Sequence, residues 1–435
     1  MNPEATEAIT LKPPSVFGNR SFILLFSGKI ISMLGDQIYA FALSWFILDF
    51  TKSSLTMSLF LVINTLVGAI ISPFGGGIAD RVNRKNILIW MDVIRGIVVV
   101  LAAALLYYQL IQIWMLYICA IILAICGSLF APAASAIIPN VVEENQLSQA
   151  TSMDQFVGSF CMIAGMLISG LLYNLIGITA IFLLNAVSYF SSGILEANLK
   201  IPLKVQRIKN NFSVSREFGK VLAELGEGYQ YVKQNKLTLK LTLMYALFNL
   251  VVFPYALIYL PYAFNVVLKA TPFQLALAIG SAFIGNMIGA CLVQVFSGRY
   301  KLKTSIAWGL FIWSFCILVI TGLLFLHLVK GRFTIWEFTL IGSGLAVIGG
   351  TAFMFCCIPI NVIFQKFTLD EYRGRFWGFQ SSITALTTAA GFLIGGLLAQ
   401  KVWMVFLFLS TSVALGLVDL WIANVKEVRE LKDRM

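Results

Sequence analysis

The sequence predicts an all-α membrane protein with twelve transmembrane helices. Hydrophobic residues make up 59% of its 435 residues and charged residues only 12%, far from the balance of soluble domains. Its apolar runs reach the roughly 20 residues that a helix needs to cross a bilayer, and they lack the alternation of a membrane β-strand. Helices follow because a backbone inside the bilayer must satisfy its own hydrogen bonds.

The apolar runs are separated by polar or turn-forming segments. The first 21 residues contain no apolar stretch followed by a small-residue cleavage site, so we expect residues 1–21 to form a cytoplasmic tail and not a cleaved signal peptide. The predicted spans are residues 22–50, 55–79, 87–109, 111–138, 152–176, 178–199, 237–264, 273–297, 305–329, 335–364, 376–400 and 402–424.

Basic residues are distributed unevenly between the two sides of these spans. If the N-terminus is cytoplasmic, the cytoplasmic segments, counted up to Lys240 at the start of the seventh span, hold 24 of the 31 Lys and Arg residues. The outer segments hold five, and Lys29 and Arg95 lie deeper inside spans. Because basic loops stay in the cytoplasm, we expect a multi-pass protein of the plasma membrane with both termini cytoplasmic. The net charge of +11 then needs no nucleic acid as a partner, since anionic membrane lipid supplies the counter-charge.

The sequence offers little for metal or cofactor chemistry. All seven cysteines fall inside predicted spans, where we expect small core residues, and the single histidine is His327. No phosphate-binding Walker loop, HExxH or GxSxG pattern occurs. We therefore expect no enzyme activity, no cofactor, no metal site and no transport driven by ATP.

A polar segment, residues 200–236, divides the spans into six and six. We expect two helical bundles, residues 22–199 and 237–424, and a cytoplasmic tail at 425–435. Within the linker, SREFGKVLAELGEGYQYVKQNK places apolar residues at helical spacing between charges, which predicts an amphipathic helix on the cytoplasmic face. The segment GMLISGLL at 165–172 recurs as GFLIGGLL at 391–398, in the fifth span of each half, and repeated halves are typical of transporters.

The segment GGGIADRVNRKN, residues 75–86, lies between the second and third spans. Taken alone, its charges could simply follow the rule that basic loops stay in the cytoplasm. In a chain with six-plus-six spans, the pattern G-x-x-x-D-R-x-x-R-K resembles the signature loop of the major facilitator superfamily, which implies a role in gating. The residues of the pattern are Gly76, Asp80, Arg81, Arg84 and Lys85.

Three further stretches resemble the branch of that superfamily that contains macrolide-efflux proteins and the enterobactin exporter. They are GKIISMLGDQIYAFALSWFILDFTKSS in the first span, DVIRG at 92–96 and GEGYQYVKQNK at 226–236. The resemblance covers essentially the whole chain. It departs from many drug exporters in the fifth span, where GSFCMIAGMLISG has no Gly-Pro pair, and this departure leaves the direction of transport open.

The resemblance implies a monomeric secondary active transporter that works by alternating access. We expect a proton-coupled exporter, that is an antiporter, of a small amphipathic compound such as a drug or a siderophore. Two alternatives of the same fold stay open. One is an uncoupled facilitator or importer, and the other is a lysolipid flippase or a membrane sensor that does not transport.

Two ionisable residues, Lys29 and Asp36, lie inside the first span. They are seven residues apart, about 10.5 Å along a helix, and therefore share one face. A charge at such depth costs on the order of 2.5 to 3.5 kcal/mol, and in the resembled family the first span of each half lines the central cavity. Asp36 is the predicted proton carrier, with Asp154 as a second candidate. Lys29 could tune Asp36, receive an anionic substrate group, or only brace the helices with Asp36 through water.

Asp92 and Arg95 stand at i and i+3 near the start of the third span, which is the spacing of a helical ion pair. We expect them to join the gate network beside Asp80. Glu196, near the end of the sixth span, is expected at the membrane interface. Polar and aromatic residues predicted to line the substrate cavity are Tyr39, Trp45, Asn64, Asn249, Tyr255, Tyr259, Asn286, Asn361 and Gln380.

Overall fold

The computed structural model describes residues 18–79, 82–199, 214–296 and 302–424, and these segments are almost entirely helical. The first half contains α1 (Arg20–Thr51), α2 (Ser54–Ala79), α3 (Arg84–Tyr107), α4 (Ile113–Val141), η2 (Glu144–Gln146) and α5 (Leu147–Ala197). Next come α6 (Val214–Gln234), α7 (Lys236–Pro254), η3 (Tyr255–Tyr259), α8 (Leu260–Tyr262) and η4 (Ala263–Val267). The chain continues with α9 (Pro272–Val295), α10 (Leu302–Lys330), α11 (Ile335–Phe367), η5 (Asp370–Tyr372), α12 (Arg373–Lys401) and α13 (Met404–Asn424).

Eleven helical stretches of the described residues are long and apolar enough to cross a membrane. One of them, α5, contains two successive spans, because its helix breaks at Gly177. The φ of 74° at this residue is a left-handed conformation that glycine adopts without a steric penalty. The predicted twelve spans are therefore present, and the all-α membrane fold is confirmed. The break falls between the predicted fifth and sixth spans.

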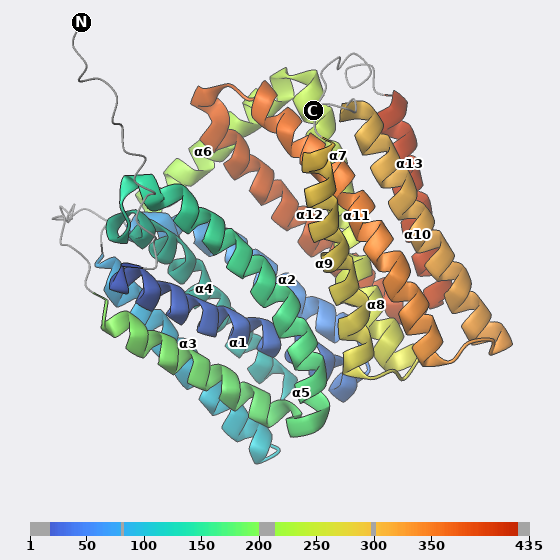
Figure 1. Ribbon diagram of the computed structural model, residues 1–435, viewed down its shortest axis with the longest axis horizontal. Coiled ribbons are helices and arrows are strands. Elements are labelled where there is room, and N and C mark those ends of the chain that lie inside the picture. The colour runs from blue at the N-terminus through green and yellow to red at the C-terminus, as the bar shows by residue number, and fades with distance from the viewer. Residues whose placement is uncertain (1–17, 80–81, 200–213, 297–301, 425–435) are drawn as a thin grey trace, which may run out of the picture.

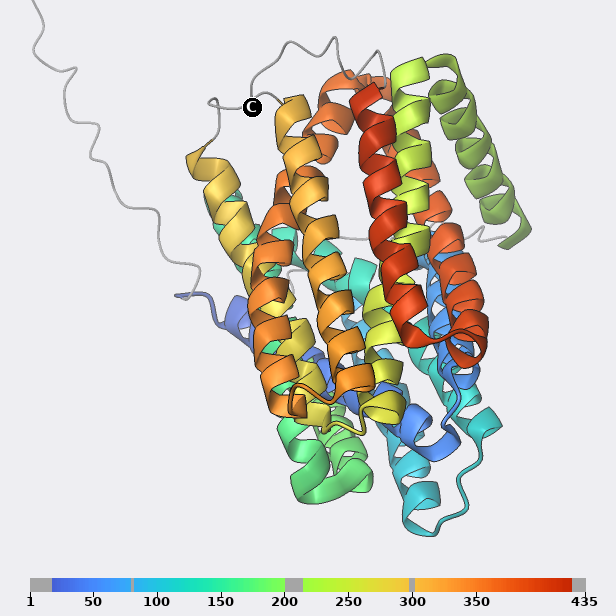
Figure 2. The ribbon, with the colours of Figure 1, turned by 90° about the vertical axis from the view of Figure 1, so that its right-hand side faces the viewer.

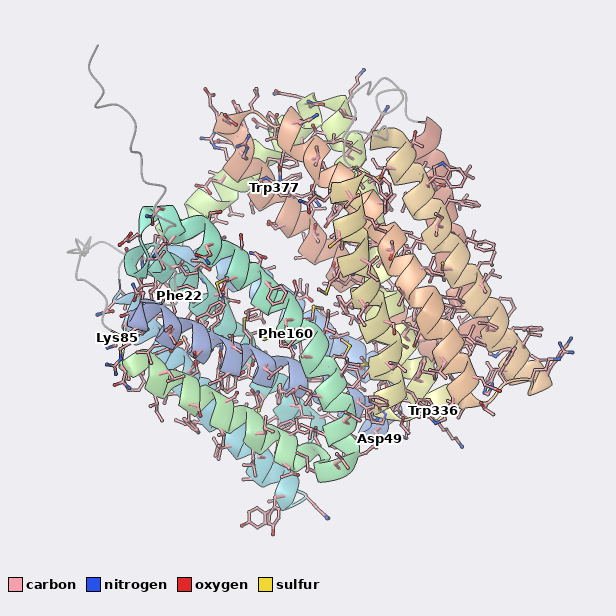
Figure 3. The ribbon with its side chains drawn as sticks, viewed as in Figure 1. Phe22, Asp49, Lys85, Phe160, Trp336 and Trp377 are labelled. Atoms are coloured by element: carbon pink, nitrogen blue, oxygen red, sulfur yellow. The ribbon has the colours of Figure 1, made fainter. Side chains whose placement is uncertain are left out.

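The outer surface of the long helices is apolar. Trp90 and Leu175 are 62% and 75% exposed, and Phe160 also points outward from α5 (Figure 3). Lys85 and Asp49, by contrast, lie at opposite ends of the first six spans (Figure 3). Large apolar patches of this kind mark surfaces that are covered by something other than water, and here the covering medium is lipid.

The helices form two groups, which Figure 1 shows side by side. In the first group, α1 packs against α5, α3 packs against α4 and α5, and α2 packs against α4. In the second group, α11 packs against α9 and α10, α13 against α10, and α12 against α7. Figure 2 shows the helices of the second group standing in front of the first.

The two groups meet through glycines of the repeated segment. A Cβ on Gly170 of α5 would lie 3.1 Å from the carbonyl oxygen of Pro272 in α9, and a Cβ on Gly396 of α12 would lie 3.2 Å from the carbonyl oxygen of Ser54 in α2. The Ser54 hydroxyl also donates a hydrogen bond to the Gly396 carbonyl at 2.8 Å. Ser54 begins α2 and therefore lies at the end of the molecule opposite the start of α1, so this contact closes the end away from the N-terminus.

The other glycine of each repeat packs within its own group. Gly165 lies against Gln37 of α1, and its counterpart Gly391 lies against Leu250 and Pro254 of α7. Each repeat thus contacts the first span of its own half and the second span of the opposite half. The repeat in the sequence corresponds to equivalent packing positions in the two groups.

Helix α6 contains all but the last two residues of the predicted amphipathic segment, and it packs against the start of α12. Tyr231 stacks on Tyr372 with ring centroids 4.9 Å apart, and Glu227 pairs with Arg375 at 2.9 Å. The connecting helix is therefore held by the second group at the end where α12 begins.

Candidate functional site

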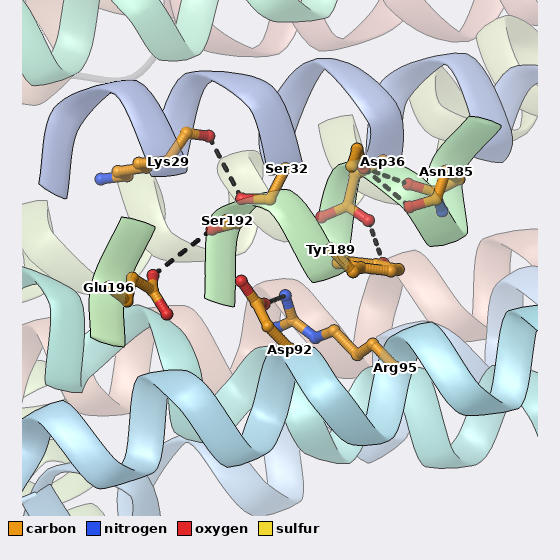
Figure 4. A network of polar contacts seen from close by, with 10 residues as sticks. Lys29, Ser32, Asp36, Asp92, Arg95, Asn185, Tyr189, Ser192 and Glu196 are labelled. Carbon is orange, nitrogen blue, oxygen red and sulfur yellow. Dashed lines mark hydrogen bonds and ion pairs between the residues drawn. The ribbon is translucent and has the colours of Figure 1, made fainter. Parts of the chain in front are cut away.

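The two ionisable residues of α1 contact different segments of α5. Lys29 forms an ion pair with Asp154, before the break at Gly177, and each of these two side chains is 17% exposed. Tyr189, after the break, donates a hydrogen bond to Oδ1 of Asp36 (Figure 4). Lys29 and Asp36 are therefore not paired with each other, and each has a partner on a segment that is distant in the sequence.

Two glycines bring α1 close to the second segment of α5. A Cβ on Gly28 would lie 3.2 Å from the Ser192 hydroxyl oxygen, and a Cβ on Gly35 would lie 2.9 Å from the Cβ of Ser188. Small residues allow this close approach of helices in a bilayer. Since each glycine directly precedes an ionisable residue, the same spacing of seven residues places Lys29 and Asp36 beside the contact.

Arg95 lies between aromatic rings in the interior of the first group. Its guanidinium carbon is 4.9 Å from the ring centroid of Phe130 and 5.5 Å from that of Tyr189. Nη1 of Arg95 is 3.5 Å from Oδ1 of Asp92, one turn earlier in α3. The residue is only 5% exposed, and its charge interacts with the carboxyls of both Asp36 and Asp92. The predicted pair is present, and it faces α1 and α5 (Figure 4).

A third carboxyl, that of Glu196, completes this cluster. The expectation that Glu196 lies at the membrane interface is wrong, because the residue is fully buried. The Ser192 hydroxyl is 3.5 Å from Oε1 of Glu196 and lies within hydrogen-bonding reach of Asp92. Among the described residues, Oε2 of Glu196 and Oδ2 of Asp92 have no hydrogen-bond partner. Asp36, Asp92, Glu196 and Arg95 are called the buried cluster below.

The gating motif is described only in part. Asp80 and Arg81 lie outside the described residues, and Gly76 is part of α2. Arg84 donates to the Ala136 carbonyl in α4 at 2.8 Å, and Lys85 donates to the Leu199 carbonyl after α5 at 2.9 Å. These two basic residues hold the ends of neighbouring helices together.

Six of the predicted cavity residues are buried, and Tyr39, Trp45, Asn249, Tyr255 and Tyr259 are five of them. Tyr39 packs on Phe182 in the first group, and its hydroxyl has no partner among the described residues. Tyr255 packs on Phe408 in the second group, and Trp45 of α1 belongs to the core of that group.

The other four differ in their surroundings. Asn64 and Asn361 donate to carbonyls one turn earlier in their own helices, at 3.1 and 3.0 Å, and Asn286 is half-buried. Gln380 is buried, and neither polar atom of its side-chain amide has a partner within the described part of the chain. A cavity of about 490 Å³ lies elsewhere, between α9, α10 and α11, where Trp308 and Phe355 line it. None of the predicted cavity residues lines this cavity.

Comparison with known proteins decides the family. Residues 25–379 match the family model described as "Major Facilitator Superfamily". The chain belongs to the major facilitator superfamily. It is 25% identical over 429 residues to macrolide efflux protein A of Streptococcus pyogenes, which covers 94% of this chain and 97% of that protein. It is also 24% identical over 189 residues to the staphyloferrin A transporter of Staphylococcus aureus, covering 43% of this chain and 47% of that protein.

A solved transporter structure has the same fold. The bacterial homologue of the iron transporter ferroportin, in an inward-facing state, superposes with a TM-score of 0.67 at 16% sequence identity, over 93% of this chain and 99% of that chain. The chain is thus a multi-pass membrane transporter of this superfamily, and it has twelve spans.

The sequence did not single out Tyr189 or Ser192, and it gave Glu196 no role in the site. A tyrosine and a serine inside an apolar run give no signal, because such residues are frequent in membrane helices. Only the spacing of Tyr189, Ser192 and Glu196 at helical intervals of three and four residues could have indicated a polar face on the sixth span.

Proposed function

We propose that this transporter is a proton-coupled exporter of a small amphipathic compound, with Asp36 as the proton carrier. The observation that supports this role is the setting of Asp36 inside a membrane span. The residue is half-buried, accepts a hydrogen bond from Tyr189 and faces the Arg95 guanidinium. A carboxyl in such a setting can change between a charged and a neutral form within the bilayer.

The proton would act by changing the attraction between α1 and α3. Ionised Asp36 attracts Arg95 across these helices, whereas the protonated carboxyl does not. A proton therefore shifts the equilibrium between two arrangements of the first group, and a transporter with two such arrangements can couple proton binding to alternating access.

Lys29 is proposed as a structural and gating residue, because its charge is already balanced by Asp154. An anionic substrate group would have to compete with this carboxylate for Lys29. The pair joins α1 to the first segment of α5, so its breakage or formation would accompany movement of these two helices. Asp154 is accordingly proposed as the partner of Lys29, and the coupling role is proposed for Asp36.

The superfamily relatives support the substrate class. One relative that aligns over almost the whole chain is named for macrolide efflux, and macrolides are amphipathic. A siderophore is a second candidate, since a shorter match is named for staphyloferrin A. We place both termini in the cytoplasm and the protein in the plasma membrane. In that orientation, the contact between Gly396 and Ser54 would close the outer face of the transporter. The protein would work as a monomer.

Transport into inside-out membrane vesicles tests the proposal. A proton gradient is imposed, and the uptake of a radiolabelled macrolide, erythromycin, is measured for the wild type and for Asp36→Asn. We expect the variant to lose gradient-driven accumulation but to keep exchange of labelled for unlabelled macrolide. Asp49→Asn is the matched control, because Asp49 is an exposed residue of the same helix. Full gradient-driven accumulation by Asp36→Asn would contradict the coupling role and favour an uncoupled facilitator.

A further inference from the structure

The buried cluster contains more carboxyls than its one cation can balance. Asp36 of α1, Asp92 of α3 and Glu196 of α5 are brought together with Arg95 (Figure 4). Three ionised carboxylates with one guanidinium would leave an uncompensated charge of two in the interior. Because an unpaired buried charge is very costly, part of this cluster must hold protons.

The neighbouring elements do not supply the missing positive charge. On α1, Lys29 is paired with Asp154, and on α3, Lys85 is bound to the Leu199 carbonyl. Helix α4 carries no charged residue between Ile113 and Val141, and the titratable groups facing the cluster from α4 and α5 are the neutral Cys126 and Tyr189. Within the described residues, Arg95 is therefore the cation available to all three carboxyls.

Of the three carboxyls, Glu196 has the fewest partners that would stabilise its ionised form. It is fully buried, has no ion pair, and its one hydrogen-bond donor among the described residues is Ser192 at 3.5 Å. Its other oxygen has no partner. Asp92 has Arg95 at 3.5 Å, and Asp36 has both Tyr189 and Arg95. The proton that the charge balance requires therefore resides first on Glu196.

Glu196 is fully buried, but it lies close to one end of α5. It is the last residue but one of α5, which ends at Ala197. Tyr189, the partner of Asp36, lies seven residues earlier, about 10.5 Å deeper along the helix. The Ser192 hydroxyl lies between these two levels and reaches both Glu196 and Asp92. Asp92 and Asp36 are linked electrostatically, because the charge of Arg95 interacts with both carboxyls.

We infer that Glu196 is a second proton-binding group of this transporter, through which Asp36 exchanges its proton with the solution at the end where α5 terminates. Glu196 releases a proton to water as its carboxyl becomes a carboxylate, and it takes up the proton that leaves Asp36 by way of Asp92 and the Ser192 hydroxyl. No other reactant is required. This inference rests on the proposed role of Asp36 and adds to it the route by which that residue is loaded.

Infrared difference spectroscopy of the purified full-length protein tests the inference without a substrate. At neutral pH we expect the wild type to show an absorption band of a protonated carboxyl that Glu196→Gln lacks. After a pH jump, the band of Asp36, identified by its loss in Asp36→Asn, should respond at least about tenfold more slowly in Glu196→Gln. Glu196→Asp keeps a carboxyl and should restore most of the rate, and Glu371→Gln, at an exposed residue, should match the wild type.

Ser192→Ala provides a second route to the same answer should Glu196→Gln fail to fold. It keeps all carboxyls but removes the hydroxyl between Glu196 and Asp92, so we expect the Glu196 band to remain and the response of Asp36 to slow. An unchanged carboxyl band in Glu196→Gln, or an unchanged Asp36 response in Ser192→Ala, would overturn the inference. Failure of the proposed function would look different, since Asp36→Asn would then retain full gradient-driven export whatever the Glu196 variants showed.

Discussion

The Lys29 ammonium pairs with the Asp154 carboxylate, which lies 125 residues further along the chain. This contact joins α1 to the first segment of α5, while Asp36, on the same face of α1, is bound by Tyr189 of the second segment. The charge of Lys29 is therefore directed away from Asp36, and the two residues are expected to have separable roles.

Loss of either partner of this ion pair should destabilise the protein. Because both side chains are mostly but not fully buried, we expect Lys29→Gln and Asp154→Asn each to lower the free energy of unfolding by about 1 to 3 kcal/mol, less than the roughly 3 to 5 kcal/mol of a fully buried pair. The exchanged pair Lys29→Asp with Asp154→Lys should recover part of the loss. Thermal unfolding in detergent gives the stabilities.

The pH profile of export separates this role from the alternatives for Lys29. In Lys29→Gln we expect an unchanged pH optimum, because Lys29 is paired with Asp154. A shifted optimum would instead indicate that Lys29 tunes Asp36. Weaker binding of anionic compounds alone would indicate a substrate anchor.

Arg95 should be the most sensitive charged residue of the first group. Arg95→Gln leaves Asp36 and Asp92 without their buried counter-charge, so we expect a loss of stability of about 3 to 5 kcal/mol. The double variant Arg95→Gln with Asp92→Asn should be more stable than Arg95→Gln alone, since it removes a buried carboxylate that has lost its partner. Thermal unfolding of the single and double variants measures this coupling. Equal stabilities of Arg95→Gln and the double variant would contradict this expectation.

Replacing Gly170 or Gly396 with a larger residue should separate the two groups of helices at the end of the molecule away from the N-terminus. We expect Gly170→Leu and Gly396→Leu to clash with α9 and α2, at a cost of about 1 to 3 kcal/mol, which corresponds to roughly a 5-fold to 150-fold shift in population. Ser58 of α2 is buried and lies against Gly396. In Gly170→Leu, the cysteine of Ser58→Cys should therefore become more reactive toward an impermeant maleimide. Gly344→Leu is the control, because no atom lies near a Cβ at that position. Unaltered reactivity in Gly170→Leu would argue against movement at this contact.

The predicted orientation can be tested at two exposed lysines. Lys233 lies at the end of α6, and Lys330 ends α10. We expect Lys233→Cys to be labelled only after access to the cytoplasmic side and Lys330→Cys only from outside. Labelling of both from one side would be incompatible with cytoplasmic termini and twelve spans.

Much of the fold could be predicted because a bilayer constrains the sequence strongly. Spans are visible as apolar runs, and the repeat around Gly165 and Gly391 marks equivalent positions. The contact made by each glycine could not be predicted, because it depends on which helices become neighbours across the two groups. Gly177 gave no signal of its own, although a break between the fifth and sixth spans was expected at that position.

The sequence indicated several residues of the candidate site, but it did not indicate which of these residues contact one another. An ionisable residue stands out in an apolar span, so Lys29, Asp36 and Arg95 were recognisable. Asp154 as the partner of Lys29 was not, because helix packing decides which distant residues meet. Glu196 was misplaced since it is near a helix end, where charges usually reach the interface, whereas here α1 and α3 pack over the last turns of α5.

Proton movement driven by the substrate alone tests the role of Asp36 most directly. Purified protein is reconstituted in liposomes that contain a pH-sensitive dye, with a macrolide gradient and equal pH on both sides. For the wild type we expect macrolide flow to move protons in the opposite direction, and for Asp36→Asn we expect macrolide flow with no change of internal pH. Equal proton movement by the wild type and Asp36→Asn would contradict the account.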